Sequence, residues 1–91
     1  MEKKLLRISD TDNVAVALRD IKSGERLALP GGGELTAATD IPYGHKVALE
    51  AVSVGHPVIK YGEAIGLASR AIDRGEWVHT HNMGAGGDEA S

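Results

Sequence analysis

Short apolar runs, separated by turn-forming residues, follow one another along nearly the whole chain. They are rich in β-branched residues and bounded by Gly, Pro, Asn and Asp, a pattern typical of short strands. The expected strands are Leu5–Ile8, Val14–Leu18, Lys46–Leu49, Val58–Tyr61 and Trp77–His81. One stretch, Glu63–Ile72, instead repeats its apolar residues at helical spacing and predicts a short helix, although Gly62 and Gly66 disfavour it. The pattern therefore predicts a mainly β fold with at most one or two short helices.

A local pattern of seven residues occurs four times, around the glycines at positions 24, 44, 55 and 75. Each copy has a β-branched residue three positions before the glycine and an aliphatic residue three positions after it. Glycine permits the positive φ that a type II turn requires at its third position, and Pro42 suits the second position of its turn. The glycines are separated by 20, 11 and 20 residues. Because a solenoid needs a constant period, this spacing indicates two similar halves with two turns each.

The length of 91 residues fits one domain. We place this domain at residues 1–83 and expect a flexible, glycine-rich tail at 84–91. The three glycines at 31–33 are open to two interpretations. Their backbone N–H groups could hold an anion, or they could form the tip of a hairpin, which we favour.

Composition excludes several classes of protein. The formal net charge is −3 and the basic residues are scattered, whereas binding to nucleic acid requires clustered cations. The longest apolar run, Val14–Leu18, is far shorter than a membrane-spanning helix. There is no cysteine, so disulfides and thiolate metal sites are excluded. A cytoplasmic protein is expected, and the few aromatic residues predict a thin core that a partner surface helps to complete.

The segment Gly75–Asn82 contains the most informative polar residues. In an extended strand, His79 and His81 project from the same face, about 6.5–7 Å apart. Two imidazoles at this distance can bind one metal ion or one carboxylate. The alternative is a pair of ordinary surface histidines on an edge strand. Trp77 is interpreted as a core anchor.

Two further positions suit an anionic ligand. His45 and Lys46 place a cation beside an imidazole directly after a turn glycine, although an exposed turn histidine is the simpler reading. Tyr61 follows Lys60 at the end of an apolar strand; these two could be donors, or amphipathic residues at a strand end. No complete acid/base or nucleophile set is present. From pattern alone, the chain is a small β domain, with a binding module as one possible role.

Several blocks in order resemble the N-terminal domain of the altronate/galactarate dehydratase family, a SAF-type domain with a β-clip fold. The resemblance covers residues 5–83 and rests on four blocks: Asp12–Ala17, Ile41–Leu49, Val58–Gly66 and Trp77–Asn82.

The resemblance implies a role in the dehydration of sugar acids, in which a base removes the proton next to the carboxylate and a hydroxyl leaves. It also implies a divalent metal, usually iron in the family, held mainly by a large subunit. Some relatives have a separate small subunit of about this length, as does sulfolactate sulfo-lyase, which eliminates sulfite. This chain resembles such a small subunit, and we expect it to be inactive alone. The rival interpretation is a non-catalytic module that binds a carbohydrate acid or a peptide.

Site residues are also assigned by this resemblance. The predicted catalytic and metal-binding residues are His79 and His81. The predicted substrate-binding residues are His45, Lys46, Tyr61 and Asn82.

Overall fold

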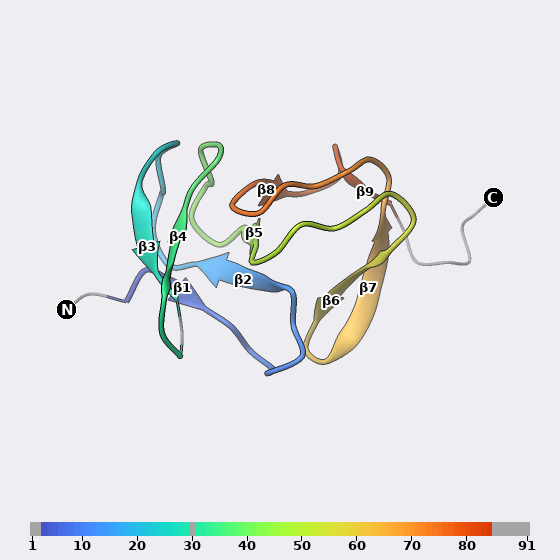
Figure 1. Cartoon of the computed structure of the whole chain (residues 1–91), viewed down its shortest axis with the longest axis horizontal. Helices are drawn as coiled ribbons and strands as arrows, with labels where there is room; N and C mark the ends of the chain where they lie inside the picture. The colour runs from blue at the N-terminus through green and yellow to red at the C-terminus, as the bar shows by residue number, and fades with distance from the viewer. Residues whose placement is uncertain (1–2, 30, 85–91) are drawn as a thin grey trace.

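The structure is a computed structural model that describes residues 3–29 and 31–84. These residues form β1 (Leu5–Leu6), β2 (Val14–Ala17), β3 (Arg26–Ala28), β4 (Glu34–Thr36), β5 (Lys46–Ala48), β6 (Pro57–Lys60), β7 (Glu63–Ala68), β8 (Trp77–Val78) and β9 (Met83–Gly84). All strand pairs are antiparallel and build three sheets, β1-β2-β5-β8, β3-β4 and β6-β7-β9. The four-stranded sheet lies between the other two (Figure 1). The prediction of a mainly β domain is confirmed.

The predicted helix at Glu63–Ile72 is wrong. Residues Glu63–Ala68 form β7, which pairs with β6 on one side and with β9 on the other. A side chain at Gly66 would collide with the carbonyl oxygen of Gly84, so glycine is needed where β9 pairs with β7. Sheet pairing on both sides therefore outweighs the helical spacing of the apolar residues. No helix occurs in the described residues, and so none that could span a membrane.

Each of the four predicted turns has its glycine at positive φ, between 84° and 88°. The turns are also bonded in the same way. The N–H of Gly44 donates to the carbonyl of the buried Ala17 (2.8 Å), and the N–H of Ala17 donates to the carbonyl of His45 (2.8 Å). The same pair of bonds joins Gly24 to Ala37, Gly55 to Ala68 and Gly75 to Ala48. The turn motif is therefore a repeated structural unit.

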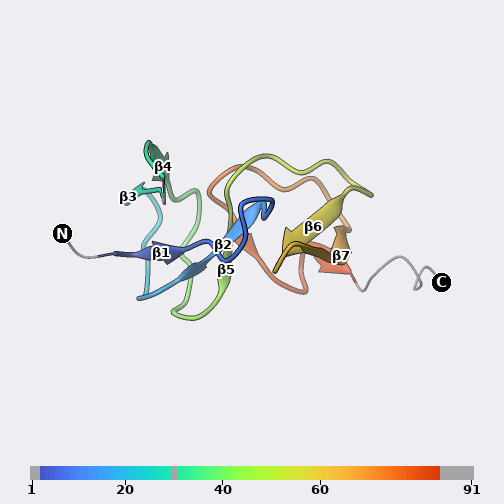
Figure 2. The same ribbon diagram turned by 90° about the horizontal axis from the view of Figure 1, so that it is seen from below.

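The turns combine in two pairs, which confirms the predicted halves. In the first half, Ile21 and Ile41 form a bridge with two hydrogen bonds of 2.9 Å, and in the second half Val52 and Ile72 do the same. Each half ends in its own hairpin, β3–β4 or β6–β7, at opposite ends of the molecule (Figures 1 and 2). The three glycines at 31–33 lie at the tip of the first hairpin, as predicted, and all have positive φ.

Each half has its own apolar core. The first core contains Leu5, Ala15, Ala17, Ile21, Leu27, Leu35, Ala37, Ile41 and Val47. The second contains Val14, Ala48, Val52, Val58, Ala68, Ile72 and Val78. Strands β2 and β5 contribute to both cores, because successive residues of a strand face opposite sides. The central sheet therefore joins the halves.

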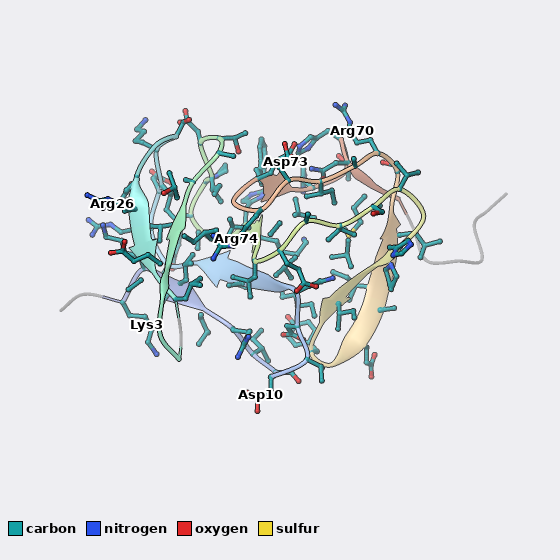
Figure 3. All side chains as sticks on the ribbon, viewed as in Figure 1. Lys3, Asp10, Arg26, Arg70, Asp73 and Arg74 are labelled. Atoms are coloured by element: carbon teal, nitrogen blue, oxygen red, sulfur yellow. The ribbon has the colours of Figure 1, made fainter. Side chains whose placement is uncertain are left out.

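Polar contacts also hold the two halves together. Arg74 donates from Nε to the carbonyl of Leu49 (3.2 Å) and from Nη2 to the carbonyl of Glu34 (3.1 Å). It lies in the middle of the view, between the first hairpin and the central strands (Figure 3). The side chain of Asn13 binds the backbone of β6 through Pro57 and Ile59. Both side chains fix one half against the other.

The last predicted strand is too long. Only Trp77–Val78 is extended, and the chain turns over the next four residues before β9. The backbone N–H groups of Asn82 and Met83 both donate to the carbonyl of His79 (3.1 and 3.0 Å). Strand β9 includes Gly84, the first residue of the predicted tail, and the rest of that tail lies outside the described residues.

Candidate active site: three histidines around Trp77

The loop that carries His79 and His81 is held by the side chain of Asn82. This side chain is fully buried, with 0% exposure. Its Oδ1 accepts the backbone N–H of His79 (3.0 Å), and its Nδ2 donates to the carbonyl of Trp77 (2.8 Å). Both functional ends of the amide are thus bonded to the loop. Asn82 positions the histidines, and a direct bond from Asn82 to a substrate would require this loop to rearrange.

Two contacts from the residues directly after β7 support the same loop. The N–H of Ser69 donates to the carbonyl of Asn82 (2.9 Å), and Nε of Arg70 donates to the carbonyl of His81 (3.2 Å). The loop is therefore tied to its neighbours along its length. Its histidine side chains project from a fixed backbone.

Trp77 is the centre of the site. Its ring stacks on the ring of His79, with centroids 5.5 Å apart and planes 8° from parallel. The ring of His81 lies 5.2 Å from it at a tilt of 52°. His45 meets it edge-on at 5.4 Å and also lies 5.0 Å from the ring of His79. Three of the four histidines of the chain therefore gather around its only tryptophan.

A hydrogen bond joins Trp77 to His45. The indole Nε1–H donates to Nδ1 of His45 at 3.2 Å. His45 reaches this position because the turn at Gly44 binds Ala17, and β5, which follows the turn, pairs with β8. This strand pairing brings His45 to Trp77 and His79, although the residues are far apart in sequence.

Lys46 lies on the other side of the sheet from this cluster. It pairs with Val78 of the second core, whereas its neighbour Val47 pairs with Trp77. Burial lowers the pKa of Lys46, and the nearby positive charge of Lys60 lowers it further. Lys46 can contact an anion, but not as a direct neighbour of His45 in one subsite.

Tyr61 is at the tip of the second hairpin and contacts Lys60 and Asp12. It has a positive φ of 63° beside Gly62 at 74°, as a two-residue hairpin turn requires. The Asp12 carboxylate accepts the N–H groups of both residues, at 3.1 and 2.8 Å. Burial raises the pKa of Asp12, but bonds from the backbone N–H groups of Gly62, Ser9 and Tyr61 outweigh it and lower the pKa overall. Tyr61 is 61% exposed, and Lys60 Nζ lies 4.8 Å from the centroid of its ring.

The prediction that His79 and His81 hold a metal stays a prediction. Neutral imidazoles suit iron and zinc, which take three or more protein ligands in catalytic sites. Across residues 3–29 and 31–84, no group of three or more His, Cys, Asp or Glu residues is arranged to hold a metal ion. In this part of the chain, His79 and His81 are two candidate ligands, fewer than such a site needs.

Sequence reasoning missed the role of Trp77, which it treated as a core anchor. The ring does pack against the first core, but it also contacts three histidines. The available signal was its position two residues before His79 on a predicted strand. The strand pairing of Trp77 with Val47 then brings His45 to it.

Comparison with known proteins gives the family of this chain. Residues 3–85 match the altronate/galactarate dehydratase SAF domain. This chain belongs to that family. It is 44% identical over 80 residues to altronate dehydratase of Bacillus subtilis, and 47% identical over 75 residues to galactarate dehydratase (L-threo-forming) of Escherichia coli. These alignments cover 88% and 80% of this chain, but only 16% and 14% of the relatives.

A shorter relative is covered more fully. The chain is 56% identical over 48 residues to (2R)-sulfolactate sulfo-lyase subunit alpha of Paracoccus pantotrophus. That alignment covers 53% of this chain and 72% of the relative. The SAF domain therefore occurs both within long dehydratase chains and in a named subunit of a lyase.

Proposed function

We propose that this chain is the small subunit of a sugar-acid hydro-lyase of the altronate/galactarate dehydratase type. In this proposal it works with a separate large subunit in a metal-assisted β-elimination and has no activity alone. The observation that best supports this proposal is the cluster of His45, His79 and His81 around Trp77. Family membership supports the reaction class, since the dehydratases that share this domain act on sugar acids by name.

The geometry suits a site completed by another surface. His45 and His79 are partly exposed and His81 is exposed, so the rings are accessible. Their backbone is nevertheless fixed by Asn82 and by the turn at Gly44. Rings with fixed positions at an open surface can contact a substrate that a second chain holds. This arrangement limits the mobility that would weaken catalysis.

The elimination needs a base for the proton next to the carboxylate and a group that assists departure of the hydroxyl. An imidazole can do either at neutral pH. We assign His79 and His81 to this work or to metal binding, and His45 to an anionic oxygen of the substrate. A divalent metal bound with the large subunit would stabilise the negative charge that develops on the substrate. Lys46 and Tyr61 remain candidates for contacts farther from the cluster.

The proposal is tested by mixing the purified chain with a large dehydratase subunit that lacks its own SAF domain. Aldarates and aldonates are then screened for formation of 2-keto-3-deoxy acids with Fe²⁺ present. Activity that requires both chains is the expected result. Stable association without turnover of any acid would contradict the catalytic role and favour a non-catalytic binding module.

A second candidate function is the small subunit of a sulfolactate sulfo-lyase. The favouring observation is the 56% identity to the alpha subunit, which this chain covers over 72% of its length. The same mixture, supplied with (2R)-sulfolactate and assayed for sulfite, separates the two candidates. Release of sulfite without dehydration of sugar acids would replace the first proposal by this one.

A further inference from the structure

The hydrogen bond between Trp77 and His45 has a direction that determines the chemistry of His45. An indole N–H is a donor only, so Nδ1 of His45 must be the acceptor. In a neutral imidazole, one nitrogen accepts and the other carries the proton. The proton of neutral His45 is therefore on Nε2. With Nδ1 occupied and Nε2 protonated, neither nitrogen has a free lone pair for a metal.

Trp77 is itself held firmly enough to impose this state. Its backbone N–H donates to Oγ1 of Thr39 (3.1 Å), and its carbonyl accepts from Asn82 (2.8 Å). It is paired with Val47 in the sheet, and its ring packs against the first core. These restraints come from different parts of the chain. The direction of the indole N–H is thus set by the fold.

His79 and His81 differ from His45 in this respect. His79 stacks on Trp77 and His81 lies against it at a tilt, but within the described residues neither imidazole makes a hydrogen bond. Their nitrogens are free to accept a proton or to bind a metal. The three histidines therefore divide into one ring with a fixed tautomer and two with open nitrogens.

We infer that Trp77 is a positioning residue that fixes His45 as a hydrogen-bond donor through Nε2 and leaves metal or proton chemistry to His79 and His81. The donor faces an electron-rich oxygen, such as a carboxylate or hydroxyl of the substrate. This last step rests on the proposed function. The tautomer of His45 and the role of Trp77 do not.

NMR spectroscopy of the full, ¹⁵N-labelled chain tests the inference without substrate or partner. The chain has one tryptophan, so the spectrum contains a single indole N–H signal. Spectra are recorded at about pH 8, above the ordinary pKa of an imidazole in solution, and long-range ¹H–¹⁵N correlations identify the protonated nitrogen of each ring. We expect His45 to carry its proton on Nε2. A proton on Nδ1 of His45 would overturn the inference.

Two variants test the hydrogen bond between Trp77 and His45, one by removing its donor and one by removing its acceptor. Trp77→Phe keeps an aromatic ring but removes the N–H, and should give His45 a mixture of tautomers. His45→Ala removes the acceptor, and should speed exchange of the indole proton by about tenfold, the value of one ordinary hydrogen bond. His56→Ala is the matched control, since His56 follows the glycine of an equivalent turn but is exposed.

An unchanged His45 tautomer in folded Trp77→Phe would show that Trp77 acts only by packing. If that variant fails to fold, the test rests on exchange of the Trp77 indole proton in His45→Ala. An exchange rate equal to that in His56→Ala would contradict the inference. In the reconstituted enzyme, Trp77→Phe should raise KM more than it lowers kcat. A lower kcat at unchanged KM would contradict the substrate contact, whatever the free chain shows.

Discussion

Two turns of the molecule carry a histidine after their glycine, and only one of them belongs to the candidate site. The turns at Gly44 and Gly55 share a φ of 84° and a bond of 2.8 Å to a buried alanine. His45 contacts Trp77 and His79, whereas His56 is exposed. The backbone motif is the same in both. The site is therefore created by what the neighbouring strand places opposite the turn, which for His45 is Trp77.

The other two turns have glutamate at this position and use it structurally. Oε1 of Glu25 accepts the backbone N–H of Lys22 (3.1 Å), and Oε1 of Glu76 accepts that of Asp73 (2.8 Å). A carboxylate of this length reaches back to its own turn and satisfies a free N–H group. The imidazole of His45 instead points to Trp77. One position in a repeated turn can thus serve stability or function.

Substitution of the turn glycines should cause the largest loss of folding stability. Gly75 is buried, and a Cβ there would collide with the carbonyl oxygen of Thr36 in addition to adopting φ +87°. Gly44 has φ +84° but no atom near its Cβ position. We expect Gly75→Ala to cost about 3 kcal/mol or more and Gly44→Ala about 1 kcal/mol. Urea unfolding measures both, and equal losses would contradict the close packing at Gly75.

The second-largest loss of stability is expected in the loop that carries His79 and His81. Asn82→Ala removes a fully buried amide and leaves the half-buried N–H of His79 and carbonyl of Trp77 without this partner, and should cost about 2–3 kcal/mol. The control is Asp40→Ala, which removes an exposed bond to the N–H of Ser23 (2.8 Å) and should cost less than about 1 kcal/mol. Faster hydrogen exchange at His79 should accompany the loss. A stable Asn82→Ala with unchanged exchange would remove Asn82 from its positioning role.

The smallest effect is a dependence of stability on pH. The hydrogen bond from Lys4 (2.7 Å), followed by that from the Lys22 backbone, lowers the pKa of Glu25 below its ordinary 4.5. A carboxyl whose folded pKa is lowered stabilises the fold above its unfolded pKa, and this contribution is lost as pH falls through the folded pKa. The contribution is less than about 1 kcal/mol because the pair is partly exposed.

Glu25→Gln and Lys4→Met should therefore reduce the loss of stability between about pH 5 and pH 3. Thermal unfolding across that range measures the difference from the unmodified chain. A parallel decline in all three proteins would show that this pair does not contribute.

The turns could be predicted from sequence because their signal is local. A turn that needs positive φ requires glycine at one position, and this glycine recurs together with its flanking aliphatic residues. The sequence pattern also includes an alanine seven residues before each turn glycine. Its role becomes clear only from the structure, where these alanines (Ala17, Ala37, Ala48 and Ala68) bond to the turns. The predicted helix failed because the pairing of Glu63–Ala68 with β9 depends on residues far along the chain.

The site residues themselves stay a prediction. His79 and His81 stand out by their spacing and His45 was added by the family resemblance, and the structure places all three rings around Trp77. Their true arrangement depends on two features without a local pattern. One is the loop after Val78, which is closed by the buried amide of Asn82. The other is the contact between His45 and Trp77, 32 residues apart in sequence. Lys46 lies apart from the cluster because strand alternation turns it away from its neighbour His45.

The most direct test of the proposed histidine site is turnover by the proposed two-chain enzyme, reconstituted with single-histidine variants. His79→Ala and His81→Ala should each lower kcat/KM at least about tenfold, or about 1.4 kcal/mol, with the fold intact by circular dichroism. His56→Ala, from the equivalent turn outside the cluster, should stay within about twofold of the unmodified enzyme. Full activity in both cluster variants, or an equal loss in His56→Ala, would contradict a catalytic site around Trp77.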